Sequence, residues 1–342
     1  MCTMPSRTEF ELISRIRGRK PPNNSAVRLG IGDDCAILST LPGNELTVTT
    51  DMLIEDVDFR KAWMAPAFLG WKSLAVSLSD IAAMGATPTA CLLALALPPE
   101  LTGRYFDQLI DGFLDACDFW AVPLAGGDIS SSEKVCLTVT AFGTVPKGKA
   151  LRRSGARPGD LVAVMGELGL SRRGLQILEE EQPAIAELAS SEELEEWAQT
   201  PDRARALRAH LLPRPLVAEA IWLGENGLAH SMIDVSDGLL ADLQHILEES
   251  GVAAEIDADS LQPLQSTAQP LLDLDLVLNG GEDYCLLLTL SPEQFASVRA
   301  SRAPGFPSFF SIGRILQGSP SISLLEGGTR RNYRIKGFEH FR

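Results

Sequence analysis

The chain has 342 residues, of which 45% are hydrophobic and 22% charged, and its formal net charge is −15. This length permits two domains, each with its own core. The acidic balance argues against nucleic acid as the main partner, because phosphate backbones are held mostly by Lys and Arg. No apolar run approaches the ~20 residues of a membrane span, and the start lacks a secretory pattern, so we expect a cytoplasmic protein with no membrane partner. The six cysteines are scattered without a C-x-x-C pair, which favours reduced thiols over zinc or disulfides.

Strand and helix signals are mixed in the first half without strict alternation, which indicates an α+β fold. The helix expected at 67–84 has apolar helical spacing and stops at Gly85, with Pro88 beyond. The other elements expected here are strands at 46–50, 89–98 and 135–145 and a helix at 103–120.

A stretch rich in Gly, Pro and basic residues at 146–160 is the best candidate linker. We therefore predict an N-terminal domain over 1–148 and a C-terminal α/β domain over 149–342. In the second domain we expect strands at 160–166, 284–290, 309–316 and 321–327 and helices at 170–180, 213–227, 239–250 and 291–301. The acidic stretch at 187–197 is interpreted as a solvated helical face.

Short acidic clusters recur where an apolar segment ends, each beside Gly, Ser or Thr: LGIGDDCAIL, TVTTDML, AVSLSDIAAMG, PLAGGDIS, SMIDVSDGLL and LNGGEDYCLLL. If the clusters converge, their carboxylates repel one another and take up protons unless divalent cations keep them ionised. Oxygen ligands without His or Cys favour Mg²⁺, which usually bridges to phosphate oxygens. The set therefore predicts a magnesium–nucleotide site.

Each cluster taken alone also has an ordinary structural interpretation. GDD, GGD and GGED are common turn sequences, and VSDG can cap a helix through Ser236 or Asp237. Asp80 differs, because it interrupts an apolar helix where an unpaired charge is costly. The four histidines do not adjoin an acidic motif in the sequence, which argues against a Ser–His–Asp hydrolase. His245 is expected to be structural.

Other nucleotide-binding signatures are absent from the sequence. There is no G-x-x-x-x-G-K-[ST] loop, and GIGDDC lacks the third glycine of a dinucleotide fingerprint. The catalytic loop and metal-binding triplet of protein kinases are also missing.

Taken in order, GIGDDCAIL, TTDML, SLSDIAAMGATP, GGD, IDVSDGLLADL and GGEDYCLLLT resemble the thiamine-monophosphate kinase family. That family belongs to the ATP-binding superfamily of aminoimidazole ribonucleotide synthetase and selenophosphate synthetase. The resemblance runs from about Glu9 to the end of the chain. It implies a two-domain α+β architecture with a dimerising N-terminal sheet, and a homodimer whose nucleotide lies near the intersubunit surface. It also implies phosphorylation of thiamine monophosphate by ATP, giving thiamine diphosphate.

The resemblance carries over a set of site residues by motif. Several Mg²⁺ ions would be held by Asp34, Thr49, Thr50, Asp51, Asp80, Asp128, Asp234 and Asp237. The nucleotide would contact Gly127, Asp128, Arg153 and Ser236, although Arg153 also fits an exposed linker arginine. Thiamine monophosphate would contact Glu282 and Phe338; the latter also fits an ordinary packed aromatic. Asp58 stands where many relatives carry histidine, so the way in which the protein binds the acceptor stays open.

The implied reaction needs no general base, because a phosphate monoester with a second pKa of about 6 is largely dianionic at neutral pH. Cations and alignment are what an in-line transfer between two phosphates requires. Two alternative functions compete with this kinase activity. One is another enzymatic activity of the same superfamily, and the other is non-catalytic nucleotide binding. No early Cys lies in a glycine-rich, Lys-containing segment as selenophosphate synthesis would need, and the end FEHFR lacks the cysteine used in hydrogenase maturation. Because the acidic motifs are intact, a non-catalytic protein of this superfamily is disfavoured.

Overall fold

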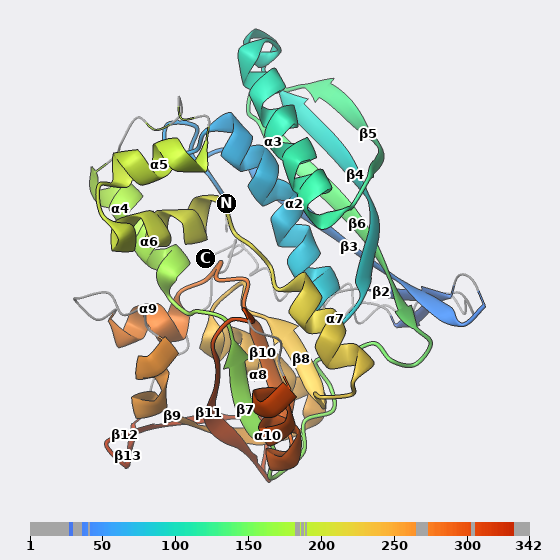
Figure 1. Cartoon of the computed structure of the whole chain (residues 1–342), viewed down its shortest axis with the longest axis vertical. Helices are drawn as coiled ribbons and strands as arrows, with labels where there is room; N and C mark the ends of the chain where they lie inside the picture. Colours follow the sequence, from blue (N-terminus) through green and yellow to red (C-terminus); the bar gives the residue numbers. More distant parts are fainter. Residues whose placement is uncertain are drawn as a thin grey trace, which may run out of the picture.

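The computed structural model describes residues 27–29, 36–39, 42–181, 185, 188, 190–264, 273–301 and 305–331. Within these residues the chain folds around two separate sheets, one N-terminal and one C-terminal, which lie at opposite ends of an elongated molecule (Figure 1). The architecture is α+β, as the mixed signals in the sequence predicted.

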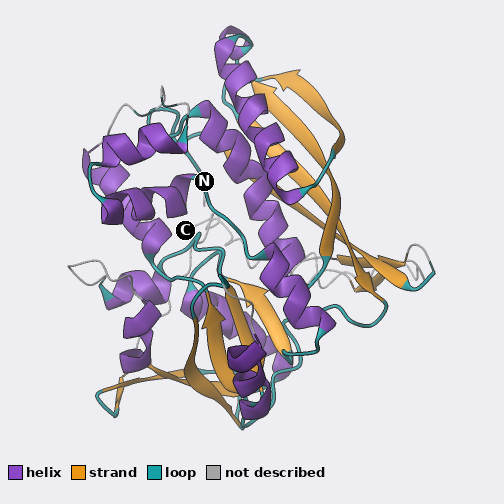
Figure 2. Cartoon of the chain, in the orientation of Figure 1, coloured by secondary structure: helices purple, strands orange, loops and turns teal. Residues whose placement is uncertain are grey.

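The N-terminal half is built on a six-stranded sheet with the order β1-β2-β3-β6-β4-β5. Its strands are β1 (Val27–Leu29), β2 (Ala36–Ser39), β3 (Asn44–Ile54), β4 (Thr87–Leu97), β5 (Leu124–Ser131) and β6 (Cys136–Pro146). Neighbouring strands are antiparallel, except that β4 and β5 run parallel. Helices α2 (Pro66–Ala83) and α3 (Arg104–Trp120) cover one face of the sheet, and no described helix covers the other (Figure 2).

Helix α2 is buried along most of its length between the sheet and α3. Two glycines allow this close packing. A Cβ at Gly70 would lie 2.0 Å from the carbonyl oxygen of Leu109, and a Cβ at Gly112 would lie 1.9 Å from that of Ala67. Because the two backbones touch, α2 cannot shift without disturbing α3, and the polar side chains that α2 carries are held in fixed positions.

The C-terminal half contains a seven-stranded sheet with the order β13-β12-β9-β11-β7-β10-β8. Its strands are β7 (Leu161–Met165), β8 (Ser231–Asp234), β9 (Ala253–Asp257), β10 (Leu286–Leu290), β11 (Phe309–Leu316), β12 (Ile322–Glu326) and β13 (Thr329–Arg331). The helices of this half are α4 (Leu170–Glu181), α5 (Ser191–Ala198), α6 (Pro201–Leu211), α7 (Val217–Glu225), α8 (Leu239–Ser250), α9 (Leu274–Asn279) and α10 (Pro292–Ser301).

Helices α4, α5 and α6 follow the linker in the chain but pack with the N-terminal core. Ile177, Leu194 and Leu207 belong to the same buried apolar cluster as the side chains of α2 and the first sheet. Figure 1 shows these helices beside α2 rather than beside the second sheet. The domain boundary at 148/149 therefore remains a prediction. Apolar side chains from both sides of this boundary belong to one buried cluster.

Most predicted elements are confirmed, including the helices at 67–84, 103–120 and 239–250 and the strands at 89–98, 135–145 and 309–316. The sequence GGD, for which a turn was one interpretation, lies inside strand β5. The acidic stretch does form a helix, α5, but its Leu194 is fully buried. Helix α6 and strands β8, β9 and β13 were not anticipated.

None of the described helices is long and apolar enough to cross a membrane. Cys91, Cys117, Cys136 and Cys285 are free thiols, as their scattered positions predicted. The Sγ atoms of Cys91 and Cys117 are buried 4.0 Å apart, where α3 packs on β4.

Candidate active site

Strand β3 and helix α2 bring four of the polar side chains together. Alternation along β3 points Thr49 and Asp51 toward the same face, the one that α2 covers. The Thr49 hydroxyl donates a hydrogen bond to Asp80 Oδ2, and the Ser77 hydroxyl donates one to Asp51 Oδ2 at 2.7 Å. The charge of Asp80, which the apolar spacing of its helix marked as unusual, therefore has a polar partner across the layer.

A third carboxylate reaches the same helix from the C-terminal sheet. Asp234 ends strand β8 and is 2% exposed, and the hydroxyl of Ser79 donates to its Oδ2 at 2.5 Å. Helix α2 also contacts β8 directly. The site is thus assembled where the two halves of the chain meet on α2.

The loop after β8 is shaped by a buried carboxylate that sequence reasoning missed. Asp242 Oδ2 accepts hydrogen bonds from the backbone N–H groups of Ser236, Asp237 and Gly238 at 3.0–3.1 Å. Burial raises the pKa of Asp242, and the neighbouring Asp237 and Asp234 raise it further. The available signal was an acidic residue in the first turn of a helix, where it can bind free N–H groups.

His245 lies beside this loop in the fold. Ligand atoms of Asp237, Asp242 and His245 lie within 4.8 Å of one another, close enough to share a metal ion. The sequence places no histidine next to an acidic motif, but helix α8 carries His245 back over the loop. His245 lies on the predicted amphipathic helix, α8, and its structural role stays a prediction.

A cavity of about 620 Å³ opens next to these groups. Its lining combines acidic side chains with apolar and aromatic ones, from both halves of the chain. The lining residues include Asp51, Asp58, Phe59, Trp63, Met64, Arg172, Leu175, Leu178, His210, Ser236, Asp237, Glu282 and Tyr284. Such a lining suits a ligand that has both a phosphate and an organic ring system.

Glu282 differs from the other carboxylates because the protein itself supplies its cation. Lys72 Nζ lies 2.8 Å from Glu282 Oε1, and His210 Nδ1 lies 3.1 Å from Oε2. Burial alone would raise the pKa of Glu282, but Lys72 and His210 together hold it well below its usual range. Burial, and then Lys72, lower the pKa of His210, so at neutral pH His210 is uncharged and donates through Nδ1–H.

The backbone around Glu282 is in an uncommon conformation. Glu282 and Tyr284 have positive φ angles, 63° and 49°, although neither is glycine. Hydrogen bonds hold this turn, since the N–H of Glu282 donates to the carbonyl of Ser236 at 2.7 Å and that of Tyr284 to the carbonyl of Val235 at 2.8 Å. Such strain often marks a functional turn, and here it couples Glu282 to the loop after β8.

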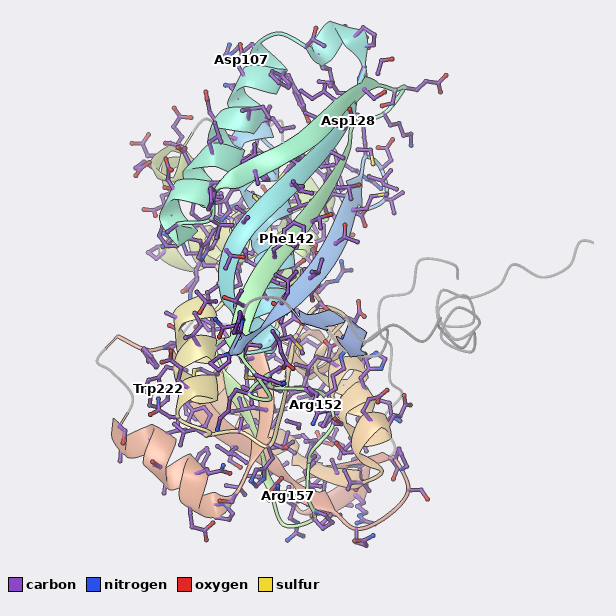
Figure 3. The ribbon with its side chains drawn as sticks, turned by 90° about the vertical axis from the view of Figure 1, so that its right-hand side faces the viewer. Asp107, Asp128, Phe142, Arg152, Arg157 and Trp222 are labelled. Atoms are coloured by element: carbon purple, nitrogen blue, oxygen red, sulfur yellow. The ribbon has the colours of Figure 1, made fainter. Side chains whose placement is uncertain are left out.

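Gly127 and Asp128 lie away from the other predicted ligands within one chain. Asp51 is opposite Val139 on β6; Val139 is opposite Leu93 on β4, which is in turn opposite Gly127 on β5. Three strand spacings separate Asp51 from Gly127, roughly 14 Å. Figure 3 shows Asp128 in the part of the sheet that is far from Arg152 and the C-terminal half.

Gly127 has a packing reason to be glycine, since a Cβ there would lie 1.8 Å from the carbonyl oxygen of Leu93. Thr50 also lies apart from the α2 cluster, because alternation along β3 points it to the open face. There its hydroxyl bonds to the Thr140 hydroxyl at 3.1 Å and the Val139 carbonyl at 3.2 Å.

The remaining predicted residues are placed as follows. Asp58 lines the cavity, and its Oδ2 accepts from the backbone N–H of Ile54 at 2.7 Å. Arg153 is half-buried in the linker, and its charge partly counters the raised pKa of Asp242, so it faces the loop after β8. Asp34 and Phe338 lie outside the described residues.

Lys72, His210, Arg172 and Tyr284 belong to the site but were not singled out from the sequence. Lys72 could have been identified from the sequence, because it is a lone cation in the apolar stretch GWKSLAVSL and a charge in such a stretch needs a buried partner. The same reasoning identified Asp80. The other residues come from α4, α6 and a loop, and only tertiary packing reveals them.

Comparisons with known proteins agree with this arrangement. Residues 32–145 match the AIR synthase related protein N-terminal domain, and residues 157–323 match the AIR synthase related protein C-terminal domain. The thiamine-monophosphate kinase of Escherichia coli K12 is 34% identical over 336 residues, which cover 97% of this chain and 98% of the relative.

Two solved structures extend the likeness to three dimensions. AaThiL complexed with AMPPCP and TMP superposes with a TM-score of 0.81 at 31% identity, over 99% of this chain and all of its own. The thiamine-monophosphate kinase of Stenotrophomonas maltophilia K279a gives a TM-score of 0.72 at 37% identity, over 93% of this chain and 98% of its own. Shared domains, near full-length identity and shared structure establish that this chain belongs to the thiamine-monophosphate kinase family.

Proposed function

We propose that this protein transfers the γ-phosphate of ATP to thiamine monophosphate, giving thiamine diphosphate and ADP. The observation that carries the proposal is the mixed cavity, which joins Asp51 on β3 and the loop after β8, with Ser236 and Asp237, to an apolar wall bearing Glu282. A phosphate ester with a cationic ring system is complementary to both parts. Support comes from AaThiL, which binds AMPPCP and TMP.

Magnesium is the metal that suits the donor set. Asp51, Asp80 and Asp234 each accept a hydrogen bond from a hydroxyl group. A metal ion at these carboxylates would therefore be bound by hard oxygen ligands. With Thr49 and Asp237 these residues would hold Mg²⁺. Asp34, Asp128 and Thr50 complete the proposed ligand set, Thr50 from the open face of the first sheet. Bound Mg²⁺ would screen the phosphate charges of both reactants and favour in-line transfer.

The residues of the chain position the reactants rather than move a proton. The acceptor phosphate is already largely dianionic near neutral pH, so no side chain has to act as its base. Ser236 and Arg153 contact the nucleotide phosphates, together with Gly127. Phe59 and Trp63 line the cavity and exclude water from the bound acceptor.

Asp58 and Glu282 are proposed to contact thiamine monophosphate, as is Phe338. The carboxylate of Asp58 lies at the cavity, where relatives often have a histidine, and it can bind the amino group of the pyrimidine. Glu282 is the partner of the positively charged thiazolium.

A homodimer accounts for the position of Gly127 and Asp128. Strand β5 is an edge strand with every residue exposed, including Ile129 at 62%. An exposed apolar edge next to an open sheet face is a surface on which a second copy can pair. We therefore place Asp128 of the partner subunit at the nucleotide site. The use of ATP and the free thiols fit a cytoplasmic enzyme.

A coupled assay tests the proposed function. Purified protein, ATP and Mg²⁺ are incubated with thiamine monophosphate, and thiamine diphosphate and ADP are quantified by chromatography. Free thiamine and an aminoimidazole precursor serve as controls. Equal, acceptor-dependent formation of both products supports the proposal, whereas ATP binding without thiamine diphosphate formation contradicts it.

A further inference from the structure

The ion pair between Lys72 and Glu282 joins a fully buried ammonium to a carboxylate that is 30% exposed at the cavity. Lys72 is 1% exposed and lies behind Glu282, and it does not itself line the cavity. His210 is also buried and approaches the other carboxylate oxygen from α6. The two residues thus hold both oxygens of Glu282 from two different helices.

Burying this pair does not by itself strengthen the fold. A buried ion pair commonly contributes no more stability than apolar side chains of similar size, because both charges lose their hydration. Lys72 is the one basic residue of α2, a helix that is buried along most of its length. A functional reason for the pair is therefore the more economical explanation.

We propose that Lys72 and His210 are positioning residues that hold Glu282 as a fixed carboxylate, and that this makes the site selective for acceptors with a positively charged ring. This inference rests on the proposed function, and it adds the residues that set the preference for a positively charged acceptor ring. Lys72 takes Oε1 and His210 takes Oε2, so the carboxylate cannot rotate. Each oxygen can accept more than one contact and still has a free direction toward the cavity.

The neighbouring charges determine what happens when Lys72 is removed. Those that face Glu282 or its partner His210 are Lys72 from α2, Arg172 from α4 and His210 from α6, with Asp283 and Tyr284 on its own turn. Without Lys72, burial and Asp283 both favour the protonated form of Glu282. His210 still opposes this, but the pKa of Glu282 rises from its lowered range, so the ring of the acceptor meets less negative charge near pH 7.

Steady-state kinetics of the full-length enzyme tests the proposal with Lys72→Met and His210→Gln. The matched control is Arg314→Met, which breaks a carboxylate pair with Glu255 on strands that do not line the cavity. We expect Lys72→Met to raise KM for thiamine monophosphate roughly 10- to 100-fold at pH 7, with KM for ATP unchanged. His210→Gln keeps a donor and should raise it less. KM in Lys72→Met should fall as pH rises and Glu282 ionises.

A second probe is a thiamine monophosphate analogue whose thiazolium is replaced by a neutral ring of the same shape. The wild-type enzyme should prefer the charged acceptor, and Lys72→Met/Glu282→Gln should lose that preference. This double variant carries no buried unpaired charge, so it remains informative if Lys72→Met folds poorly. Quenching of Trp63 fluorescence on titration with thiamine monophosphate gives the same comparison without turnover.

Two failures are distinguishable. A wild-type enzyme that forms no thiamine diphosphate overturns the proposed function and the inference with it. An active wild type whose variants keep the same KM, the same flat pH profile and the same preference for the charged ring overturns the inference alone. Equal losses in kcat and in both KM values would indicate a purely structural role, and this too would overturn it.

Discussion

The candidate site has two kinds of carboxylate, and they are neutralised differently. Asp51, Asp80 and Asp234 receive hydroxyl hydrogen bonds from serine and threonine. Glu282 instead has a lysine at 2.8 Å and a histidine at 3.1 Å. The first group can still bind a strong cation, whereas the second has its cation built in. One part of the site is therefore suited to metal and phosphate, and the other to a weakly hydrated organic cation.

This difference explains why acidic pairs stand at apolar segment ends. A carboxylate that is to hold metal must keep its negative charge available. Hydroxyl donors allow this, because they satisfy one lone pair and leave the charge in place. Substitutions in the two groups should accordingly have opposite effects on stability, although both should impair activity.

The largest effect is expected from Asp51→Asn. This change removes a charge that would hold Mg²⁺ and keeps the size of the side chain, so turnover should fall by about 10²- to 10³-fold. The Mg²⁺ concentration needed for half-maximal activity should rise as well. Circular dichroism should show an intact fold, because Asn can still accept from Ser77.

Asp107→Asn is the matched control, since Asp107 is an exposed residue on α3 outside the cavity (Figure 3). Its kinetics and Mg²⁺ dependence should equal those of the wild type. Normal turnover of Asp51→Asn at ordinary Mg²⁺ would exclude Asp51 as a ligand.

Complementation tests whether the acidic set is completed across a dimer. Asp51→Asn and Asp128→Asn are each expected to be nearly inactive. If Asp128 of the partner subunit serves the site built on Asp51, a heterodimer of the two variants has one intact site. Co-expression should then recover up to about a quarter of wild-type activity, since half of the dimers are mixed. Activity no higher than that of either variant alone would place Asp128 in its own subunit's site.

The next effect concerns stability and separates the two groups of carboxylates. Lys72→Met leaves Glu282, whose side chain is 30% exposed, without its lysine, so the free energy of unfolding should fall by about 1–3 kcal/mol. Lys72→Met/Glu282→Gln should recover most of this loss. Asp51→Asn without Mg²⁺ should be neutral or stabilising, because it removes repulsion. Urea unfolding of the three variants measures the contrast, and equal losses in all three would contradict it.

The local sequence predicted well those features that neighbouring residues determine. Helix α2 was expected at 67–84 and is observed as Pro66–Ala83, because its apolar spacing, Gly85 and Pro88 lie within one short stretch. Asp80 was recognised because a charge conflicts with that spacing. The strand character of GGD was missed, since it depends on parallel pairing with β4, which no local signal encodes.

The charge network around Glu282 could not be predicted for a similar reason. Lys72, His210 and Glu282 are far apart in the sequence and meet only because α6 packs on the N-terminal core. The resemblance to a family supplied Glu282 but not its partners. Residues that contact a ligand can be carried over by motif, whereas residues that act through others need the packed structure.

The smallest effect is a difference in pH dependence between two adjacent residues. Burial raises the pKa of Asp283 to about 7, although its carboxylate accepts from the N–H groups of Gly169 and Ser171. Its folded pKa exceeds the unfolded value of about 3.9, so its contribution to stability is full below that value and is lost as pH rises toward 7. Glu282 behaves oppositely: its pKa is lowered, and its contribution is lost only as pH falls below about 4.

Urea unfolding at pH 4.5 and pH 7.5 measures this difference. Asp283→Asn cannot ionise, so between these pH values the wild type should lose on the order of 3 kcal/mol more stability than the variant. The lost acceptor adds a penalty that is the same at both pH values and does not affect the slope. Glu282→Gln should keep most of the wild-type slope, because Glu282 stays ionised throughout this window; the slope decreases only to the extent that the charge of Glu282 helps to raise the pKa of Asp283. If Asp283→Asn also kept that slope, another group would have to titrate there, and the raised pKa of Asp283 would be wrong.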